Sequence, residues 1–368
     1  MFELTNEQRK CFGLLPVEKD WTLLELKASP YDQFRTFAYI DGTVVRKCIL
    51  SAENRLTEYE LCEQLSEDLK YLLPKTPKGK PVLLRSSTLC KRSGIGMCVS
   101  FFRSNNGIAN IDVYSHVSQQ GYYTNEYTSY QTIGQAGPQQ WIENWCAETT
   151  DDDLQDIARF AALSRKHIQF REGDVFRFKI DRHLYGYGRI LVDYAQMRKT
   201  KEPFWDILMG KPLVCSVYHI ATTRKDVSVE ELQQYDSLPS AHMMDNRIYY
   251  GEYEIIGNIP IGEREDYPIM YGDSIDVRQR AVCLQCGKLY RKKAFKQVLF
   301  GGYHNNSIGF GLNFRLSVLQ ECIKAGSNAP YWEQDIYKVN HDLRNPKFRN
   351  ELERVCQQFN LSPSQLIK

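Results

Sequence analysis

Strand-like runs that follow one another through short turns constrain this chain more than any other feature of its sequence. Residues 35–40 (RTFAYI) and 43–50 (TVVRKCIL) are rich in β-forming residues and are joined by Asp41-Gly42, a pair that type I′ hairpin turns favour. A second hairpin is predicted where MCVSFF meets GIANIDVYSHV across Asn105-Asn106-Gly107. Strands that cluster in this way, rather than alternating regularly with helices, predict an α+β fold with mostly antiparallel sheets.

Three helices are predicted in the same half of the chain. The first begins near Thr57, which has capping-box spacing with Glu60, and ends before Pro74. Its apolar stripe at helical spacing comprises Leu61, Leu65, Leu69 and Leu72. The second is PQQWIENWCAE (138–148), and the third begins at the acidic run 151–153, whose charges suit a helix N-terminus.

The second half of the chain repeats the mixture of strands and helices. Strands are predicted at 171–180, 189–195 and 211–223, with one or two more within 247–261. Short helices are predicted at 204–210 (FWDILMG) and 226–235 (DVSVEELQQY), and longer ones at 313–326 and 345–359. A length of 368 residues is natural for two domains. We place the boundary near residue 166, which gives domains 1–166 and 167–368.

Composition excludes several classes of protein. Hydrophobic residues make up 42% and charged residues 25% of the chain, the balance of a globular protein with a core. A net charge of +2 gives no overall field that would attract nucleic acid or an anionic membrane. No membrane span or secretory signal is evident, and the eleven cysteines are scattered rather than arranged as a disulfide framework. We therefore expect a soluble, cytoplasmic protein.

Short motifs that suggest cofactors or catalysis are better explained by packing. Cys283 and Cys286 form one C-x-x-C, but a zinc site needs two further ligands, and His304 or Cys322 would supply one only at unusual spacing. Cys215 and His219 lie four residues apart on a predicted strand, about 13 Å at ~3.3 Å per residue, too far for a catalytic pair. We expect no metal, no cofactor and no catalytic residue.

The glycines of LYGYG (184–188) also have a structural explanation. A phosphate-binding glycine loop lies between a strand and a helix, whereas Gly186 and Gly188 fall between two predicted strands. We interpret this segment as a hairpin turn.

Charge is distributed unevenly in the second half. Between Asp226 and Asp276 there are twelve acidic and two basic residues, a net charge of −10. Residues 165–225 hold thirteen Lys or Arg and six acids, a net charge of +7. The acidic segment also contains Tyr249, Tyr250, Tyr253, Tyr267 and Tyr271. It either forms an acidic, aromatic surface for a basic protein or is neutralised by the basic segment folding against it.

Two motifs in the second half resemble those of the immunity protein 26 family. They are Gly173-Asp174-Val175-Phe176 and Gly186-Tyr187-Gly188-Arg189, followed by YYGEYEIIGNIPI and YPIMYG. The resemblance covers about residues 168–290. It implies an α+β domain encoded beside a toxin in bacterial polymorphic toxin systems, which binds and silences that toxin, often a nuclease. It implies no catalytic residues.

We therefore expect an immunity protein that occludes a basic toxin with its acidic segment. The predicted contact residues lie in a loop bracketed by Gly262 and Gly272. They are Glu263, Glu265, Asp266, Tyr267, Tyr271 and Asp273.

Two alternatives remain open at this point. One is an enzyme whose site is dispersed around His183 and His219. The other is a nucleic-acid-binding regulator, which would use a basic cluster and would need it to extend across a continuous surface. That cluster comprises Lys288, Arg291, Lys292, Lys293 and Lys296.

Overall fold

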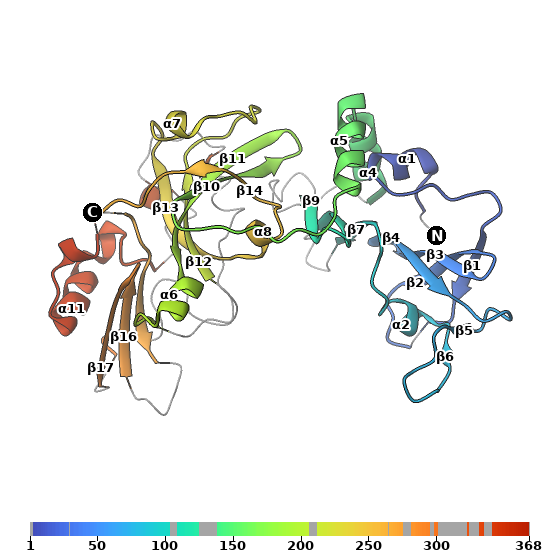
Figure 1. Cartoon of the computed structure of the whole chain (residues 1–368), viewed down its shortest axis with the longest axis horizontal. Coiled ribbons are helices and arrows are strands. Elements are labelled where there is room, and N and C mark those ends of the chain that lie inside the picture. The colour runs from blue at the N-terminus through green and yellow to red at the C-terminus, as the bar shows by residue number, and fades with distance from the viewer. Residues whose placement is uncertain are drawn as a thin grey trace. The chain divides into compact units, whose positions relative to one another are not determined.

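The computed structural model divides into two compact units, Met1–Lys166 and His167–Lys368 (Figure 1). Each is described by itself. The structure describes residues 3–28, 30–103, 109–124, 138–205, 212–263, 265–274, 281–294, 298–300, 322–323, 331–334 and 341–367. Within these residues every strand pairing is antiparallel, which confirms the α+β prediction.

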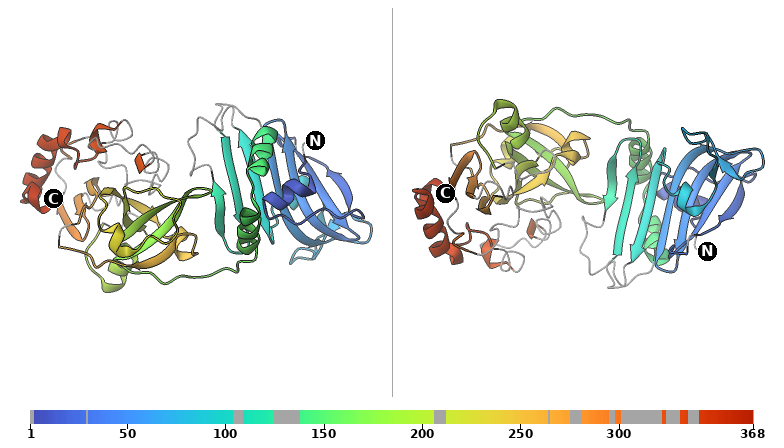
Figure 2. Two further views of the ribbon diagram at one scale, coloured as in Figure 1. Left: turned by 90° about the horizontal axis from the view of Figure 1, so that it is seen from above. Right: turned by 90° about the horizontal axis from the view of Figure 1, so that it is seen from below.

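Unit 1 is built on a seven-stranded antiparallel sheet in the order β1-β2-β3-β4-β7-β8-β9. Figure 2 shows its strands lying side by side. The strands are β1 (Thr22–Leu26), β2 (Arg35–Asp41), β3 (Val44–Ala52), β4 (Arg55–Gln64), β7 (Met97–Arg103), β8 (Ala109–Ser115) and β9 (Gln120–Thr124). Both predicted hairpins are confirmed, β2 with β3 and β7 with β8. A small ribbon of β5 (Tyr71–Leu72) and β6 (Val82–Leu83) and the short helix α2 (Ser86–Leu89) complete the unit.

The helix predicted from Thr57 is wrong, because these residues form the strand β4. Tertiary context overrides the local pattern: β4 pairs with β3 along one edge and with β7 along the other. Leu61, Leu65 and Leu72 of the predicted stripe are nevertheless buried in one hydrophobic cluster. The apolar positions were therefore correctly identified as core, although they do not share a helix.

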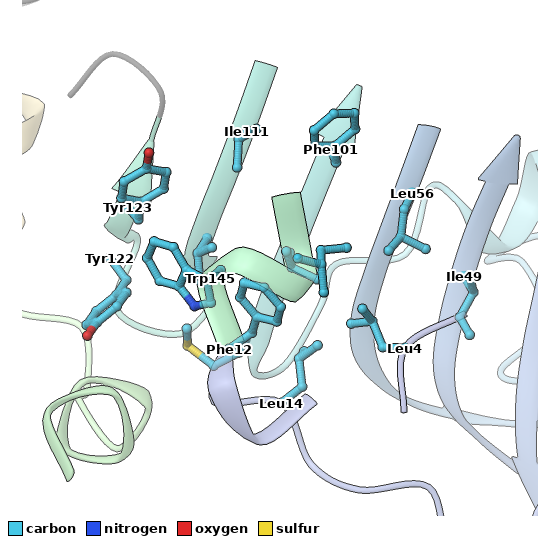
Figure 3. Close-up of a cluster of buried hydrophobic side chains, with 14 of the residues drawn as sticks. Leu4, Phe12, Leu14, Ile49, Leu56, Phe101, Ile111, Tyr122, Tyr123 and Trp145 are labelled. Atoms are coloured by element: carbon cyan, nitrogen blue, oxygen red, sulfur yellow. The ribbon is translucent and has the colours of Figure 1, made fainter. Parts of the chain in front are cut away.

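Among the residues that the structure describes, three helices cover one face of this sheet. They are α1 (Asn6–Cys11), α4 (Pro138–Ala147) and α5 (Asp151–Ala161), the last two as predicted. Figure 3 shows Phe12 and Trp145 lying between these helices and the strands. Their rings stack with centroids 5.8 Å apart, and Ile49, Leu56 and Phe101 contribute to the same cluster from the sheet. This contact attaches the helices to the sheet.

Beneath α1 the same face of the sheet buries a charged network. Arg9 of α1 donates from Nε to Glu58 of β4 at 2.7 Å, and Lys47 Nζ of β3 lies 3.5 Å from the same Oε1. Burial lowers the pKa of Lys47 against the pull of Glu58 and Glu60, and burial raises the pKa of Glu60. Buried charges of this kind are held by pairing, so the network fixes α1 on the sheet.

The described part of unit 2 contains two antiparallel sheets. The five-stranded sheet has the order β13-β12-β11-β10-β14, and the three-stranded sheet has the order β15-β16-β17. Their strands are β10 (Asp174–Asp181), β11 (Leu184–Asp193), β12 (Pro212–Tyr218), β13 (Ser237–Met244), β14 (Glu254–Asn258), β15 (Ile269–Asp273), β16 (Ala281–Cys286) and β17 (Leu289–Ala294). The helices are α6 (Tyr194–Thr200), α7 (Val229–Leu232), α8 (Asn246–Tyr249) and α11 (Arg349–Phe359). The buried side chains of α11 pack with those of β15 and β16 in one cluster.

The LYGYG segment is not the turn that the sequence predicts, because it forms the first half of β11. The turn lies earlier, between the end of β10 at Asp181 and the start of β11 at Leu184. A Cβ atom added to Gly186 would lie 2.5 Å from Phe178 Cζ, and one on Gly188 would lie 2.5 Å from Phe176 Cζ. The glycines make room for two phenylalanine rings of β10 that lie across β11.

Other predictions have mixed outcomes. The first residues of 247–261 form α8 rather than a strand, whereas 226–235 contains the predicted short helix, α7. Most residues of the two helices predicted at 204–210 and 313–326 lie outside the described residues. Among the described residues, no helix combines the length and apolar character that a membrane crossing requires.

Candidate partner-binding site

The predicted contact residues begin in the connection between β14 and β15, but they do not form a single loop. Tyr271 and Asp273 belong to β15, and Gly272 lies between them in the strand. Glu263 and Asp273 are exposed, whereas Glu265, Asp266 and Tyr267 are half-buried. The structure therefore separates these residues into different environments.

Tyr271 is fully buried, so its side chain is not available to a partner. Its hydroxyl donates to Gln358 Oε1 at 2.9 Å and accepts from the Leu299 backbone N–H at 2.8 Å. Along β15 successive side chains face opposite sides of the sheet, and that of Tyr271 faces the core shared with α11. The prediction that Tyr271 contacts a partner is therefore corrected, because its side chain belongs to the core of unit 2.

Glu265 holds a structural ion pair. Its Oε2 accepts from Arg189 Nη2 at 2.5 Å, and only 10% and 13% of the two side chains are exposed. Its Oε1 accepts from the Gly262 backbone N–H at 2.8 Å. Glu265 thus ties the connection before β15 to β11.

Asp266 makes the corresponding tie to the C-terminal part of the chain. Its Oδ2 accepts from Arg344 Nη1 at 2.6 Å and from the Ser240 backbone N–H at 2.8 Å. Arg344 is almost fully buried and also pairs with Asp342 at 2.7 Å. Burial opposes the charge of Arg344, but Asp266 and Asp342 outweigh it and raise the pKa of the guanidinium.

Much of the acidic segment is neutralised inside unit 2. Besides the pairs of Glu265 and Asp266, carboxylates of the segment pair with arginines on neighbouring elements. These pairs are Glu254 with Arg177, Glu231 with Arg224 and Glu252 with Arg247. Arg177, Arg189 and Arg224 all come from the basic segment 165–225. Of the two possibilities left open by the sequence, internal neutralisation accounts for these carboxylates.

The acidic segment keeps several exposed carboxylates but few exposed aromatic rings. Outside the pairs described above, Glu230, Asp236, Glu263 and Asp273 are exposed, and Asp276 lies outside the described residues. Tyr253, like Tyr271, is buried, and Tyr249, Tyr250 and Tyr267 are half-buried. The predicted tyrosine-rich surface is therefore reduced to partly accessible rings.

A pocket of about 220 Å³ opens beside the predicted contact residues. Glu263, Glu265 and Tyr267 are among the residues that line it. The other lining residues are Cys286, Lys288, Leu289, Ser364, Gln365, Leu366 and Ile367. Burial and the nearby Glu265 raise the pKa of Tyr267 to about 12, so its hydroxyl stays protonated at neutral pH. The lining thus includes two carboxylates, an aromatic ring and aliphatic side chains.

No sequence pattern indicated that Lys288, Leu289 and residues 364–367 line this pocket. Residues 364–367 follow the last helix, and Lys288 and Leu289 lie at the turn between β16 and β17. They meet Glu263 only because α11 packs against the three-stranded sheet. A contact between segments so far apart in sequence has no local signal.

The basic cluster lies on the edge strand β17 and the turn before it. Arg291, Lys292 and Lys293 are exposed, and Lys296 lies outside the described residues. Arg291 and Lys293 project from one face of the strand and Lys292 from the other. Lys288 Nζ donates to Glu172 Oε2 at 2.5 Å. The described residues of the basic cluster therefore do not form the continuous basic surface that a nucleic-acid-binding regulator would need.

The histidines and cysteines singled out in the sequence have structural surroundings. His219 is half-buried, with Nε2 3.1 Å from the Cys322 carbonyl oxygen and Nδ1 3.3 Å from the Tyr331 hydroxyl. His183 is exposed at the turn between β10 and β11. Cys215 is buried within β12, and burial raises the pKa of its thiol.

Cys283 and Cys286 lie on opposite faces of β16, in different hydrophobic clusters. The Cys286 thiol donates to the Leu366 carbonyl oxygen at 3.4 Å, and burial raises its pKa to about 12. Within the described residues, no three His, Cys, Asp or Glu side chains gather in a group that could hold a metal ion. His304 lies outside those residues.

Comparison with known protein families gives a match to part of the chain. No curated protein and no solved structure matches the chain. The match begins just before β10 and ends at the first residue of β16, so it includes the five-stranded sheet and β15 but not β17 or α11. Residues 171–281 match the immunity protein 26 family, as the two motifs in this segment predicted.

Proposed function

We propose that this protein is an immunity protein that binds a cognate bacterial toxin and neutralises it stoichiometrically, without catalysis. The match of residues 171–281 to the immunity protein 26 family carries this proposal. The cytoplasm is the proposed compartment. In support, none of the eleven cysteines is in a disulfide.

We propose the mouth of the pocket in unit 2 as the toxin contact. Glu263 is exposed there, next to the partly accessible ring of Tyr267. A carboxylate beside an aromatic ring suits the guanidinium or ammonium group of a basic side chain, which gains both ionic and cation–π attraction. A nuclease is a fitting toxin class, because a cleft that holds phosphates is lined by such side chains.

The internal ion pairs assign different roles to the predicted contact residues. Glu263 and Tyr267 are proposed to contact the toxin directly. Glu265 and Asp266 position them, because their carboxylates are engaged with Arg189 and Arg344. Asp273 is exposed on β15 and extends the negative charge of the surface.

Charge reversal of Glu263 tests this contact. We expect Glu263→Lys to weaken binding of the toxin encoded beside the gene by roughly ten-fold, mainly through slower association, and to reduce the dependence of binding on salt. Glu230→Lys is the matched control, because Glu230 is also an exposed acid, lies on α7 and does not line the pocket. Association rates measured by surface plasmon resonance at low and high salt decide the outcome. Equal effects of the two substitutions would refute the pocket as the contact.

A further inference from the structure

The lining of the pocket in unit 2 carries one uncompensated charge among the described residues. Glu265 is paired with Arg189 at 2.5 Å, and Lys288 is paired with Glu172 at 2.5 Å. Both of these partners lie outside the lining, so they neutralise the two charges from behind. Glu263 is exposed and forms no ion pair with a described residue. The pocket therefore attracts a group with a single positive charge.

Two further titratable side chains in the lining are neutral at pH 7. Burial raises the pKa of Tyr267 and of Cys286 to about 12 in each case. The Cys286 thiol is also engaged within the protein, because it donates to the Leu366 carbonyl oxygen at 3.4 Å. Neither group therefore adds a charge that would compete with Glu263 for a cation.

The aliphatic part of the lining is held in place before any partner binds. Leu289, Leu366 and Ile367 belong to the hydrophobic cluster that α11 forms with β15 and β16. The turn that carries the last two is closed by Gln365, whose Oε1 accepts from the Ser362 backbone N–H at 2.8 Å. A preformed site saves the cost of ordering its side chains when a ligand enters.

The size of the pocket fits one side chain better than a whole small molecule. Its volume of about 220 Å³ is below the roughly 300–1,000 Å³ of pockets that enclose small-molecule ligands. A lysine or arginine side chain combines the two properties that the lining asks for, because an aliphatic stem carries a positive charge at its end.

We propose that the pocket accepts one arginine side chain of the toxin, with the guanidinium at the Glu263 carboxylate and the Tyr267 ring. The stem would pack on Leu289 and Ile367. A guanidinium is planar, stacks on aromatic rings and pairs with both oxygens of a carboxylate, whereas an ammonium is compact and more strongly hydrated. That the arginine belongs to a toxin rests on the proposed function.

Methyl NMR of the full chain tests the pocket with small probes. The arginine probe is Nα-acetyl-arginine N-methylamide. The corresponding citrulline derivative has nearly the same shape without the charge, and the lysine derivative has the charge without the planar group. We expect the Ile367 and Leu289 methyl signals to shift with roughly millimolar affinity for the arginine probe, several-fold more weakly for lysine and not detectably for citrulline.

Glu263→Gln shows whether the carboxylate is responsible. We expect this substitution to weaken binding of the arginine probe roughly three- to five-fold. Glu230→Gln should leave it unchanged, because Glu230 is an exposed acid that does not line the pocket. Equal binding of the arginine and citrulline probes, an unaffected Glu263→Gln variant, or Ile367 methyl signals that do not respond to the arginine probe would overturn the proposal.

The probe titration and toxin neutralisation fail independently of each other. A chain that neutralises its toxin but does not distinguish arginine from citrulline would refute the arginine pocket and leave the proposed function intact. A chain that binds the arginine probe beside Ile367 but does not neutralise the toxin would support the specificity of the pocket and refute the proposed function.

Discussion

Arg189 and Arg344 determine which of the predicted contact residues a partner can use. Both guanidiniums are largely buried, and each holds a carboxylate from the connection before β15. A buried charge that loses its partner is costly, so Glu265 and Asp266 contribute to stability. Glu263 lies two residues before Glu265 and is exposed. In the proposed arrangement it does not pair with a buried arginine, so it is available to a partner.

This difference predicts unequal effects of neighbouring substitutions on stability. Glu265→Gln should lower the free energy of unfolding of unit 2 by about 2 kcal/mol, because Arg189 is left with an uncompensated charge. Glu263→Gln should change it by less than about 0.5 kcal/mol. Urea unfolding of the full chain at neutral pH, followed by a probe in unit 2, measures both. Equal stabilities of the two variants would show that the Arg189–Glu265 pair is not structural.

At the scale of elements, hairpins were predictable and the strand β4 was not. Asp41-Gly42 determines a turn within a few residues, so β2 and β3 could be identified from sequence alone. Residues 55–64 form a strand because β3 and β7 pair with both edges, and the positions of those partners are not encoded locally. The Thr57 and Glu60 side chains have helix-cap spacing, but β pairing on two sides outweighs that local preference.

The strand β11 depends on two glycines whose role the sequence did not reveal. Gly186→Ala should destabilise unit 2 by about 1–3 kcal/mol, since the new methyl group would overlap the Phe178 ring. Gly262→Ala is the matched control, because the nearest atom to its added Cβ is Glu265 Oε1 at 3.4 Å. Thermal unfolding of both variants is the measurement. An unchanged Gly186→Ala variant would mean that the Phe178 side chain can move aside freely.

At the scale of the whole molecule, the candidate site combines residues inside the segment that matches the immunity protein 26 family with residues outside it. Glu263, Glu265 and Tyr267 lie within the family match, whereas Lys288, Leu289 and residues 364–367 lie beyond it. The sequence could indicate Glu263, Glu265 and Tyr267 by the charge of their segment, and the family by its two motifs. It could not indicate the lining residues beyond the family match, which depend on the packing of α11, or the burial of Tyr271.

Neutralisation by stoichiometric binding is the central claim, and titration of the toxin's own activity tests it most directly. The purified full chain is added in increasing amounts to a fixed amount of the proposed cognate toxin. We predict a linear loss of toxin activity that ends at a fixed molar ratio and does not change with incubation time. Inhibition that grows with time at substoichiometric amounts, or an undiminished toxin activity at excess, would contradict it.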